Sequence, residues 1–336
     1  MGQHAVAAAP PPPPGATLLA AENLRMSYGT RPALRGLSFS LKAGRILGFL
    51  GPNGAGKTTA IRILTTTLQP SAGSFSVDGI SSDEPDRIRR RIGVLPESLG
   101  FPKQMTGVEY LTYFGELYGL ANKHARERAI ALLADVGLQQ RGSSRIGSYS
   151  HGMRQRLGIA RALVNDPRVV FLDEPTLGLD PRGQQELLAL VQRIARERGA
   201  SVVLCSHLLS EIEGVCDDVV ILNLGQVVAS GSVADVLGEA ERNVIQVRVA
   251  PASVMKARDV LAKAGQVKQV AIIDELTGKL SVELAEPTSD ATPPDPLARN
   301  ALLRALVRAN VPVVSFGFGG NRLQDLFLQV TDEAIS

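Results

Sequence analysis

Short runs of apolar residues, separated by glycine, proline or charged residues, fill the chain between residues 17 and 50. The runs are LLAAENLRMSY, LSFSL and RILGFLG, and each has the length of a strand. A helical pattern follows in GKTTAIRILTTTL, which predicts a helix that Pro70 ends, and SFSVDG returns to a strand with a turn after it. The first part of the chain is therefore expected to contain several short strands and one early helix.

The middle of the chain alternates between helical and strand patterns. Between about 104 and 163 the pattern is mainly helical. Two apolar runs, RVVFLDEP and GASVVLCSH, then flank the helical segment PRGQQELLALVQRIARER. Strands that alternate with helices predict an α/β domain with a mostly parallel sheet.

After about residue 240 the pattern becomes strand, helix, strand, strand, helix, strand. The segments in order are NVIQVRVA, ASVMKARDVLAKAG, VKQVAIID, KLSVELAE, LARNALLRALVRAN and VPVVSFGF. This βαββαβ order predicts a small α+β domain of the ferredoxin-like type. We expect a flexible loop at PTSDATPPDP and a closing helix at NRLQDLFLQVT, and no motif in this domain indicates chemistry.

Composition narrows the picture without naming a partner. The chain has 336 residues, 44% hydrophobic and 21% charged, which is typical of a globular protein with two folded units. Residues 1–16 contain five consecutive prolines and predict a disordered leader. The formal net charge of +3 is too small to suggest electrostatic binding to nucleic acid, so no nucleic-acid partner is expected.

The chain shows neither a signal peptide nor a run of about 18 apolar residues. We therefore expect a protein that is neither exported nor membrane-spanning by itself. The two cysteines, Cys205 and Cys216, have no C-x-x-C spacing or histidine-rich neighbourhood that would suggest zinc. They are expected to be reduced, buried thiols.

The segment GPNGAGKT matches the phosphate-binding pattern G-x-x-x-x-G-K-[ST] and stands between an apolar strand and a helix. In such a loop, backbone N–H groups and the helix N-terminus bind phosphate, Lys57 reaches the terminal phosphates and the Thr58 hydroxyl ligates Mg²⁺. The expected nucleotide-binding residues here are Gly51, Pro52, Asn53, Gly54, Ala55, Gly56, Lys57, Thr58 and Thr59. The sequence therefore predicts binding of a nucleoside triphosphate.

A pair of carboxylates ends the apolar run VVFLDEPT. Asp173 is placed to hold hydrated Mg²⁺, and Glu174 to polarise a water against the γ-phosphate. The alternative is a pair that merely ends a strand. The carboxyl ends of parallel strands are where α/β sheets bind ligands, which favours the functional interpretation.

Four segments in this order, GPNGAGKT, YSHGMRQR, VVFLDEPTLGLD and LCSH, resemble the ATP-binding subunits of ABC transporters over about residues 20–235. The extra C-terminal domain resembles the exporter branch whose permease is a separate chain, the drug, polysaccharide and gliding-type exporters. The resemblance implies an ABC-type P-loop ATPase domain over 17–237, with a mostly parallel core sheet, an antiparallel N-terminal β subdomain and a helical subdomain at about 98–163. Residues 238–336 would form the ferredoxin-like accessory domain.

The resemblance also implies roles for residues outside the phosphate loop. Tyr28 matches the aromatic residue that stacks on adenine. Ser150 and Gly152 match the signature residues that contact the γ-phosphate held by the other subunit. Asp180 matches the loop that lines the dimer interface, and His207 matches the switch histidine that hydrogen-bonds the γ-phosphate.

Two positions depart from the family pattern. Glu97 stands where glutamine is usual; it can still ligate Mg²⁺ but adds negative charge near the triphosphate. The signature is YSHGM where LSGGQ is commonest, so His151 replaces a glycine and Met153 a glutamine. Only the serine and the second glycine carry over from the family.

Several local patterns allow a different interpretation. Ser150 beside His151 could suggest a hydrolase pair, but a catalytic triad converges from separate segments, and the same objection applies to CSH at 205–207. The arginines at 154, 156 and 161, and RIRRR at 87–91, predict solvated or interface faces, with lipid docking as an alternative for the second group. The aromatic stripe of Tyr110, Tyr113, Phe114 and Tyr118 predicts either core packing or a docking site for a permease.

The expected function is an ATPase subunit on the cytoplasmic face of the cell membrane, which powers export through a separate integral-membrane permease. Two copies would close head to tail around two Mg·ATP, with Lys57, Glu174 and His207 catalytic and with Thr58, Glu97 and Asp173 around the metal. Two alternatives are a soluble ABC ATPase acting on ribosomes or DNA and a regulatory ATPase with a ligand-sensing C-terminal domain. Paired cassettes in one chain or a long heptad coil would support the first alternative, and the sequence shows neither.

Overall fold

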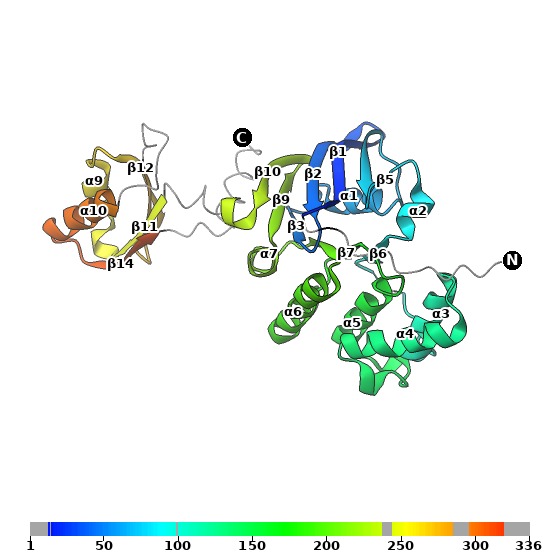
Figure 1. Cartoon of the computed structure of the whole chain (residues 1–336). Coiled ribbons are helices and arrows are strands. Elements are labelled where there is room, and N and C mark those ends of the chain that lie inside the picture. Colours follow the sequence, from blue (N-terminus) through cyan, green and yellow to red (C-terminus); the bar gives the residue numbers. More distant parts are fainter. Residues whose placement is uncertain (1–12, 14, 99, 237–243, 285–295, 319–336) are drawn as a thin grey trace. The chain divides into compact units, whose positions relative to one another are not determined.

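The computed structural model describes residues 13, 15–98, 100–236, 244–284 and 296–318 (Figure 1). It divides the chain into two compact units, Met1–Val233 and Ala234–Ser336. Most of the predicted leader, nearly all of the predicted loop PTSDATPPDP and the whole predicted closing helix lie outside the described residues.

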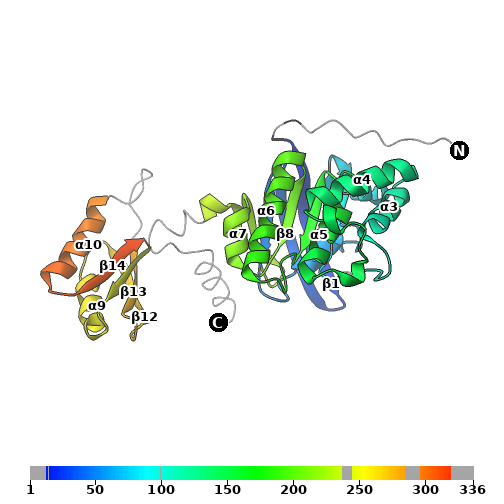
Figure 2. The same cartoon turned by 90° about the horizontal axis from the view of Figure 1, so that it is seen from below.

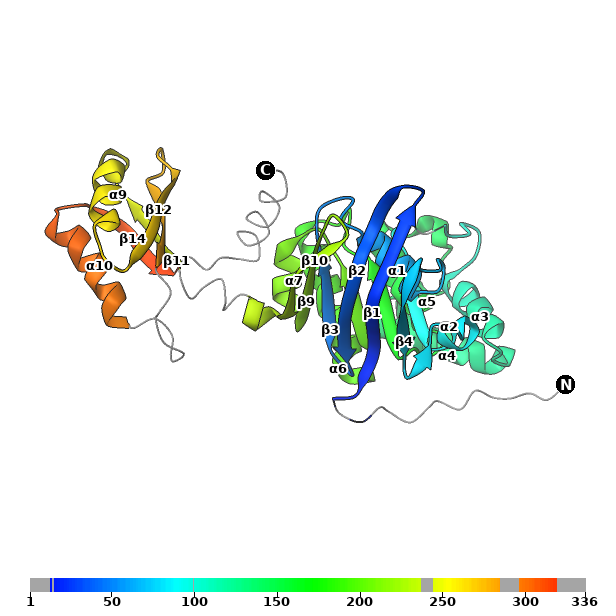
Figure 3. The same ribbon diagram turned by 90° about the horizontal axis from the view of Figure 1, so that it is seen from above.

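An antiparallel sheet of four strands, in the order β2-β1-β4-β5, opens the first unit. Its strands are β1 (Thr17–Tyr28), β2 (Arg31–Lys42), β4 (Ala72–Val77) and β5 (Ile80–Ser81). The long strands β1 and β2 lie side by side in Figure 3. The N-terminal strands therefore form the antiparallel sheet that was expected.

The second sheet of this unit has the order β10-β9-β3-β8-β7-β6. Its strands are β3 (Ile46–Leu50), β6 (Ile92–Leu95), β7 (Val169–Asp173), β8 (Ser201–Cys205), β9 (Asp218–Asn223) and β10 (Gln226–Ser232). All neighbours pair in parallel except β9 and β10. Every residue of β3, β7 and β8 is buried, which explains why those strands are continuously apolar. The predicted, mostly parallel core sheet is confirmed.

Most helices of the first unit lie where a helical pattern was predicted, but the helix at Leu209–Val215 was not predicted. They are α1 (Lys57–Leu64), α2 (Pro85–Arg89), α3 (Gly107–Leu117), α4 (Asn122–Asp135), α5 (His151–Ala162), α6 (Pro181–Arg198) and α7 (Leu209–Val215), with short 3₁₀ turns at Gln139–Arg141 and Ile146–Ser148. Helices α3, α4 and α5 form one group in Figures 1 and 2. This group accounts for the mainly helical pattern between 104 and 163.

One helix differs from its prediction. Helix α1 ends at Leu64, well before Pro70, so the prediction that Pro70 ends it was wrong. Thr66 has a left-handed φ of 61°, and the two amides that follow it donate to the carbonyl of Arg62. Arg89 Nε donates to the Thr66 hydroxyl at 2.9 Å. A β-branched residue costs about 1–2 kcal/mol in this conformation, so tertiary contacts decide where the helix ends.

The second unit is a four-stranded antiparallel sheet of order β12-β13-β11-β14. Its elements are β11 (Val244–Val249), a 3₁₀ turn at Pro251–Ser253, α9 (Val254–Ala262), β12 (Val267–Asp274), β13 (Lys279–Leu284), α10 (Pro296–Arg308) and β14 (Val313–Phe318). The predicted βαββαβ order and the ferredoxin-like class are confirmed. At the β12–β13 turn, Gly278 has φ 73°, and a Cβ there would lie 1.9 Å from the carbonyl oxygen of Val249, so only glycine fits.

Each unit has its own apolar core. Buried residues between Leu18 and Leu222 form the first core, and buried residues between Ile245 and Val311 form the second. Cys205 and Cys216 are both free thiols in the first unit, and burial raises the pKa of each. Within the described ranges, no helix combines the length and the apolar character that crossing a bilayer requires.

Candidate nucleotide site

The loop after β3 is built on glycines that have no room for a side chain. A Cβ on Gly51 would lie 2.4 Å from the carbonyl oxygen of Leu222, and one on Gly56 would lie 2.6 Å from that of Ala33. Gly56 also has φ 107° and caps α1. The loop therefore turns tightly from a buried strand into the N-terminus of a helix, the arrangement that presents backbone N–H groups to an anion.

Lys57 lies inside this loop. Its side chain is buried, and Nζ donates to the carbonyl oxygens of Gly51 at 2.5 Å and of Pro52 at 3.2 Å. Thr58 follows in the first turn of α1 and is exposed. The positive charge and the hydroxyl are thus held where the loop meets the helix.

Asp173 ends β7 at the same edge of the sheet as the phosphate loop, because β3, β8 and β7 run parallel. Only 7% of the residue is exposed. The pKa of Asp173 is raised to about 6, mainly by burial and further by the nearby charges of Glu97 and Glu174, while the charge of Lys57 offsets part of the increase. Three carboxylates therefore share one small region beside a lysine.

Glu174 and His207 form a direct pair. Glu174 Oε2 lies 2.8 Å from His207 Nδ1, and the Glu174 amide donates to the carbonyl of Cys205 at 3.0 Å. Because a carboxylate accepts hydrogen bonds, His207 Nδ1 carries the proton. Glu174 adopts a left-handed φ of 49°, which is uncommon for a residue other than glycine and turns the backbone directly after β7. The two side chains come from the ends of adjacent strands, β7 and β8.

The chemistry of the donors fits a hard cation. Thr58, Asp173 and Glu97 all offer oxygen, and Glu97 follows β6 at the same sheet edge, exposed and close enough to raise the pKa of Asp173. In the described part of the chain, no three His, Cys, Asp or Glu residues are grouped to hold a metal by themselves. Mg²⁺ usually takes one or two protein ligands and completes its shell with phosphates and water, so the donor set suits it.

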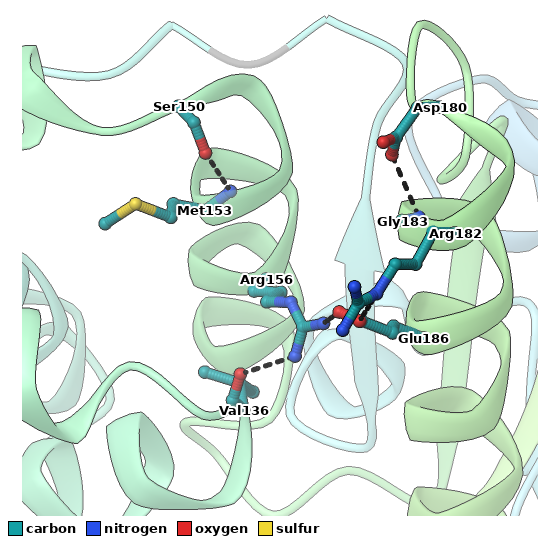
Figure 4. Close-up of polar contacts among 8 residues, drawn as sticks. All are labelled: Val136, Ser150, Met153, Arg156, Asp180, Arg182, Gly183 and Glu186. Carbon is teal, nitrogen blue, oxygen red and sulfur yellow. Dashed lines mark hydrogen bonds and ion pairs between the residues drawn. The ribbon is translucent and has the colours of Figure 1, made fainter.

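Ser150 and Asp180 begin two neighbouring helices (Figure 4). The Ser150 hydroxyl caps α5 and accepts a hydrogen bond from the Met153 amide at 3.3 Å, and Asp180 caps α6 and accepts from Gly183 at 2.9 Å. Among the described hydrogen bonds of this single chain, neither side chain is linked to residues 51–59. The structure therefore brings Lys57, Asp173, Glu174 and His207 together, while Ser150 and Gly152 stand at the start of α5.

Tyr28 stands at the end of β1 with 48% of its surface exposed. Gly29 follows it with a left-handed φ of 60° and opens the turn into β2. An exposed ring at a strand end is open to stacking against a flat ligand. Its predicted contact with adenine stays a prediction.

Comparison with known proteins identifies the family. The model of the family described as ABC transporter matches residues 34–177. The chain is 35% identical to the daunorubicin/doxorubicin resistance ATP-binding protein DrrA of Streptomyces peucetius, over 90% of this chain and 88% of that protein. The chain belongs to the ABC transporter ATP-binding proteins.

Solved structures agree with this assignment. The chain is similar to an ATP-binding subunit of an ABC transporter at 32% identity and a TM-score of 0.60, covering 67% of this chain and 93% of that one. A dimeric ATP-binding cassette bound to ADP and phosphate shares the fold at a TM-score of 0.59, with 24% identity, covering 64% of this chain and 98% of that one. The predicted family, fold class and nucleotide binding are confirmed, as is the predicted activity: an ATP-hydrolysing subunit that powers export.

The structure gives no support to a hydrolase nucleophile at Ser150–His151 or at residues 205–207 of this ABC ATPase. The Ser150 hydroxyl and the His151 ring are engaged in different bonds, to Met153 and to Leu177. At the end of β8 the Cys205 thiol is fully buried. These residues therefore support no serine or cysteine hydrolase.

The arginines of α5 were predicted to form a solvated or an interface face, and the structure shows that they do not form a solvated one. Each of its three arginines is part-buried and donates within the subunit: Arg154 to the Tyr149 carbonyl, Arg156 to the Val136 carbonyl and Glu186, and Arg161 to the Val94 carbonyl and the Tyr110 hydroxyl. Sequence spacing places side chains on a helix face but does not show what packs against that face.

The basic segment 87–91 is exposed, as predicted, but its charges are largely neutralised. Arg87 pairs with Glu84 and Arg89 with Asp86, each one helical turn apart. Arg91 pairs with Asp78. Paired arginines do not form an open basic patch, so the lipid-docking alternative gains no support.

The aromatic stripe divides between core and surface. Tyr110 is only 4% exposed and contacts Phe101 and Phe114 edge to face. Tyr113 and Tyr118 are 50% and 40% exposed. Both interpretations of the stripe therefore remain, each for different rings.

Two supporting residues were not predicted. Gly225, in the β9–β10 turn, donates to the Ala55 carbonyl at 3.0 Å and accepts from the Arg35 amide at 2.8 Å. It therefore links the phosphate loop to β2. Glu211 is 3% exposed and accepts from the Ser206 hydroxyl at 2.7 Å, directly before His207. The Leu-Gly turn between two apolar runs could have revealed the first, but nothing in the sequence marks the second.

Proposed function

We propose that this ABC ATPase works as a pair of identical subunits that enclose two Mg·ATP on the cytoplasmic side of the cell membrane and drive export through a separate permease chain. Each site combines the phosphate loop, Asp173, Glu174 and His207 of one subunit with Ser150 and Gly152 of the other. ATP-driven closure and reopening of the pair then moves the permease.

Within one site, each residue has a distinct task. Lys57 and the N–H groups of the loop neutralise the β- and γ-phosphates, and Tyr28 stacks on the adenine. Thr58, Asp173 and, through an exposed carboxylate, Glu97 provide oxygens for Mg²⁺, which offsets the charge of the phosphates. A cation also compensates the repulsion that raises the pKa of Asp173.

The observation that carries this proposal is the Glu174–His207 pair at 2.8 Å, next to Asp173 and Lys57. Glu174 takes a proton from the attacking water as general base. His207 Nδ1–H holds the carboxylate in place, and in the protonated ring Nε2 also carries a hydrogen that it can donate to a γ-phosphate oxygen. The resemblance of Ser150 and Gly152 to signature residues, which in this family contact the γ-phosphate held by the other subunit, supports the head-to-tail pairing.

Partner and cargo follow from the surface and from the relatives. Tyr113 and Leu117 on α3 and Tyr118 directly after it have exposed side chains, which are suited to contact a cytoplasmic helix of the permease. The daunorubicin/doxorubicin resistance of one relative favours a toxic small molecule as cargo. We assign the ATPase to residues 17–237, with its helical subdomain at about 98–163, and an accessory role to residues 238–336.

The test is Glu174→Gln in the purified chain. Loss of the general base lowers ATP turnover by about 10²- to 10⁴-fold, while the nucleotide still binds and holds a dimer that light scattering detects. Glu197→Gln, at an exposed position on α6, is the matched control and keeps normal turnover. Unchanged hydrolysis by Glu174→Gln would contradict the role given to Glu174.

A further inference from the structure

His151, which stands where the family usually has glycine, forms a bond that glycine cannot make. It is the first residue of α5 and follows Ser150 directly. Its Nε2 lies 2.8 Å from the carbonyl oxygen of Leu177. A carbonyl oxygen only accepts, so Nε2 donates, as it does both in the corresponding neutral tautomer and in the protonated ring. The bond therefore ties the signature residues to the segment 174–180.

The packing around this bond is close. Gly178 has φ 77°, and a Cβ there would lie 3.4 Å from His151 Nε2. A Cβ on Gly152 would lie 3.5 Å from Leu179 Cδ2. The first turn of α5 thus rests directly on residues 177–179, and the histidine lies against the turn at Gly178.

A second tie lies about one and a half turns further along α5 (Figure 4). Arg156 Nη2 lies 2.9 Å from Glu186 Oε2, and Arg182 Nε lies 3.0 Å from Glu186 Oε1. Arg156 also donates to the Val136 carbonyl at 3.2 Å, at the end of α4. The two ties lie at different positions along α5, so together they oppose both rotation and translation of the helix. Glu186 is half-exposed, and its ion pair with Arg156 therefore stabilises this arrangement less than a buried pair would.

The segment 174–180 begins with Glu174 and ends with Asp180, so it joins the catalytic carboxylate of one site to the start of α6. Ser150, on the other side of the His151 bond, serves the nucleotide held by the partner subunit. The His151–Leu177 bond is therefore a short connection within one chain between elements of two different ATP sites.

We propose that His151 is a positioning residue that couples the two ATP sites of the dimer, because it fixes Ser150 relative to the segment that carries Glu174. The proposal rests on the proposed function, which supplies the head-to-tail pair and the roles of Ser150 and Glu174. Closure of Ser150 on one nucleotide then moves the 174–180 segment of the other site, and hydrolysis becomes cooperative in ATP.

The experiment compares His151→Leu, which removes the donor at similar size, with His151→Gln, which keeps a donor at the end of a side chain of similar reach. His124→Leu, on the exposed face of α4, is the matched control. The hydrolysis rate is measured against ATP concentration. In His151→Leu the curve becomes hyperbolic and the half-saturating ATP concentration rises by roughly two- to ten-fold, the range for loss of one hydrogen bond. His151→Gln and His124→Leu keep the sigmoidal curve.

A hyperbolic curve in the unaltered protein, an unchanged curve in His151→Leu, or equal loss in His151→Gln would each overturn the coupling role. The same variants, each combined with Glu174→Gln, distinguish failure of the coupling role from failure of the proposed function. If Glu174→Gln forms no ATP-dependent dimer in light scattering, the proposed function itself is contradicted. If that dimer forms and His151→Leu weakens it by roughly two- to ten-fold, the positioning role is supported; an unchanged dimer affinity counts against it.

Discussion

At the scale of single residues, the site concentrates negative charge before any phosphate arrives. Asp173 is buried at the end of β7, and its pKa rises to about 6 because of burial and the neighbouring Glu97 and Glu174. Between about pH 4 and 6, Asp173 is therefore more often protonated in the folded protein than in the unfolded chain, and its contribution to stability falls as pH rises through that range. The same cluster of carboxylates that lowers the stability of the folded protein also favours the binding of cations.

The corresponding prediction concerns Asp173→Asn without nucleotide or magnesium. At pH 7.5 the variant is more stable than the unaltered protein by about 1–2 kcal/mol, less than the full pKa shift implies because burial also costs the polar amide that replaces the carboxylate. The difference disappears below about pH 3, where Asp173 is protonated in both the folded and the unfolded state. Urea denaturation at the two pH values measures it. A variant that is less stable than the unaltered protein at pH 7.5 would contradict the interpretation of the site as a charge-strained cluster.

At the scale of elements, α3 shows how one helix serves both the core and a surface. Thr106 and Glu109 form a reciprocal capping box that fixes its start, and these hydrogen bonds lower the pKa of Glu109. Tyr110 packs inward with Phe114, whereas Tyr113 and Leu117, four residues apart, face outward at 50% and 62% exposure. The outer face adds nothing to the core, so its apolar character needs another explanation.

For α3 we predict that polar substitutions on its exposed face weaken binding to the permease and leave ATP hydrolysis unchanged. Tyr113→Ser combined with Leu117→Ser lowers recovery of the permease with the tagged ATPase from solubilised membranes of its own cells by about ten-fold or more, the cost of removing two anchor side chains. Its ATPase rate without membranes is unchanged. Ile130→Ser, at 51% exposure on α4, is the control and leaves recovery normal. Full recovery with the double variant would show that the permease docks elsewhere.

At the scale of the whole molecule, the two cores share no residue. The unit around the first core contains the candidate nucleotide site, and the second core packs the ferredoxin-like sheet against its helices. We therefore predict that calorimetry of the full chain shows two unfolding transitions and that a chain of residues 1–236 shows one, with its ATP affinity within about two-fold of the full chain. A single transition for the full chain, or loss of ATP binding on shortening, would contradict independent units.

The success of sequence interpretation depended on how local each feature is. The strands β3, β7 and β8 were predictable because strands buried on both faces are continuously apolar, and Lys57 and Thr58 were predictable because a phosphate loop is contiguous in sequence. The end of α1 and the partners of Arg161 were not. Both depend on contacts with residues distant in sequence, Arg89 in the first case and Val94 and Tyr110 in the second.

By itself, the sequence determined the two units, the parallel core sheet, the ferredoxin-like order and the residue types of the nucleotide site, because periodicity and short motifs depend on neighbouring residues. The tertiary structure alone decided which side chains meet. It paired Glu174 with His207, raised the pKa of Asp173, joined Glu211 to Ser206 and gave His151 a partner in Leu177. The physical reason is that hydrogen bonds and charge interactions act over a few ångströms in space, and only the folded chain brings such distant residues that close.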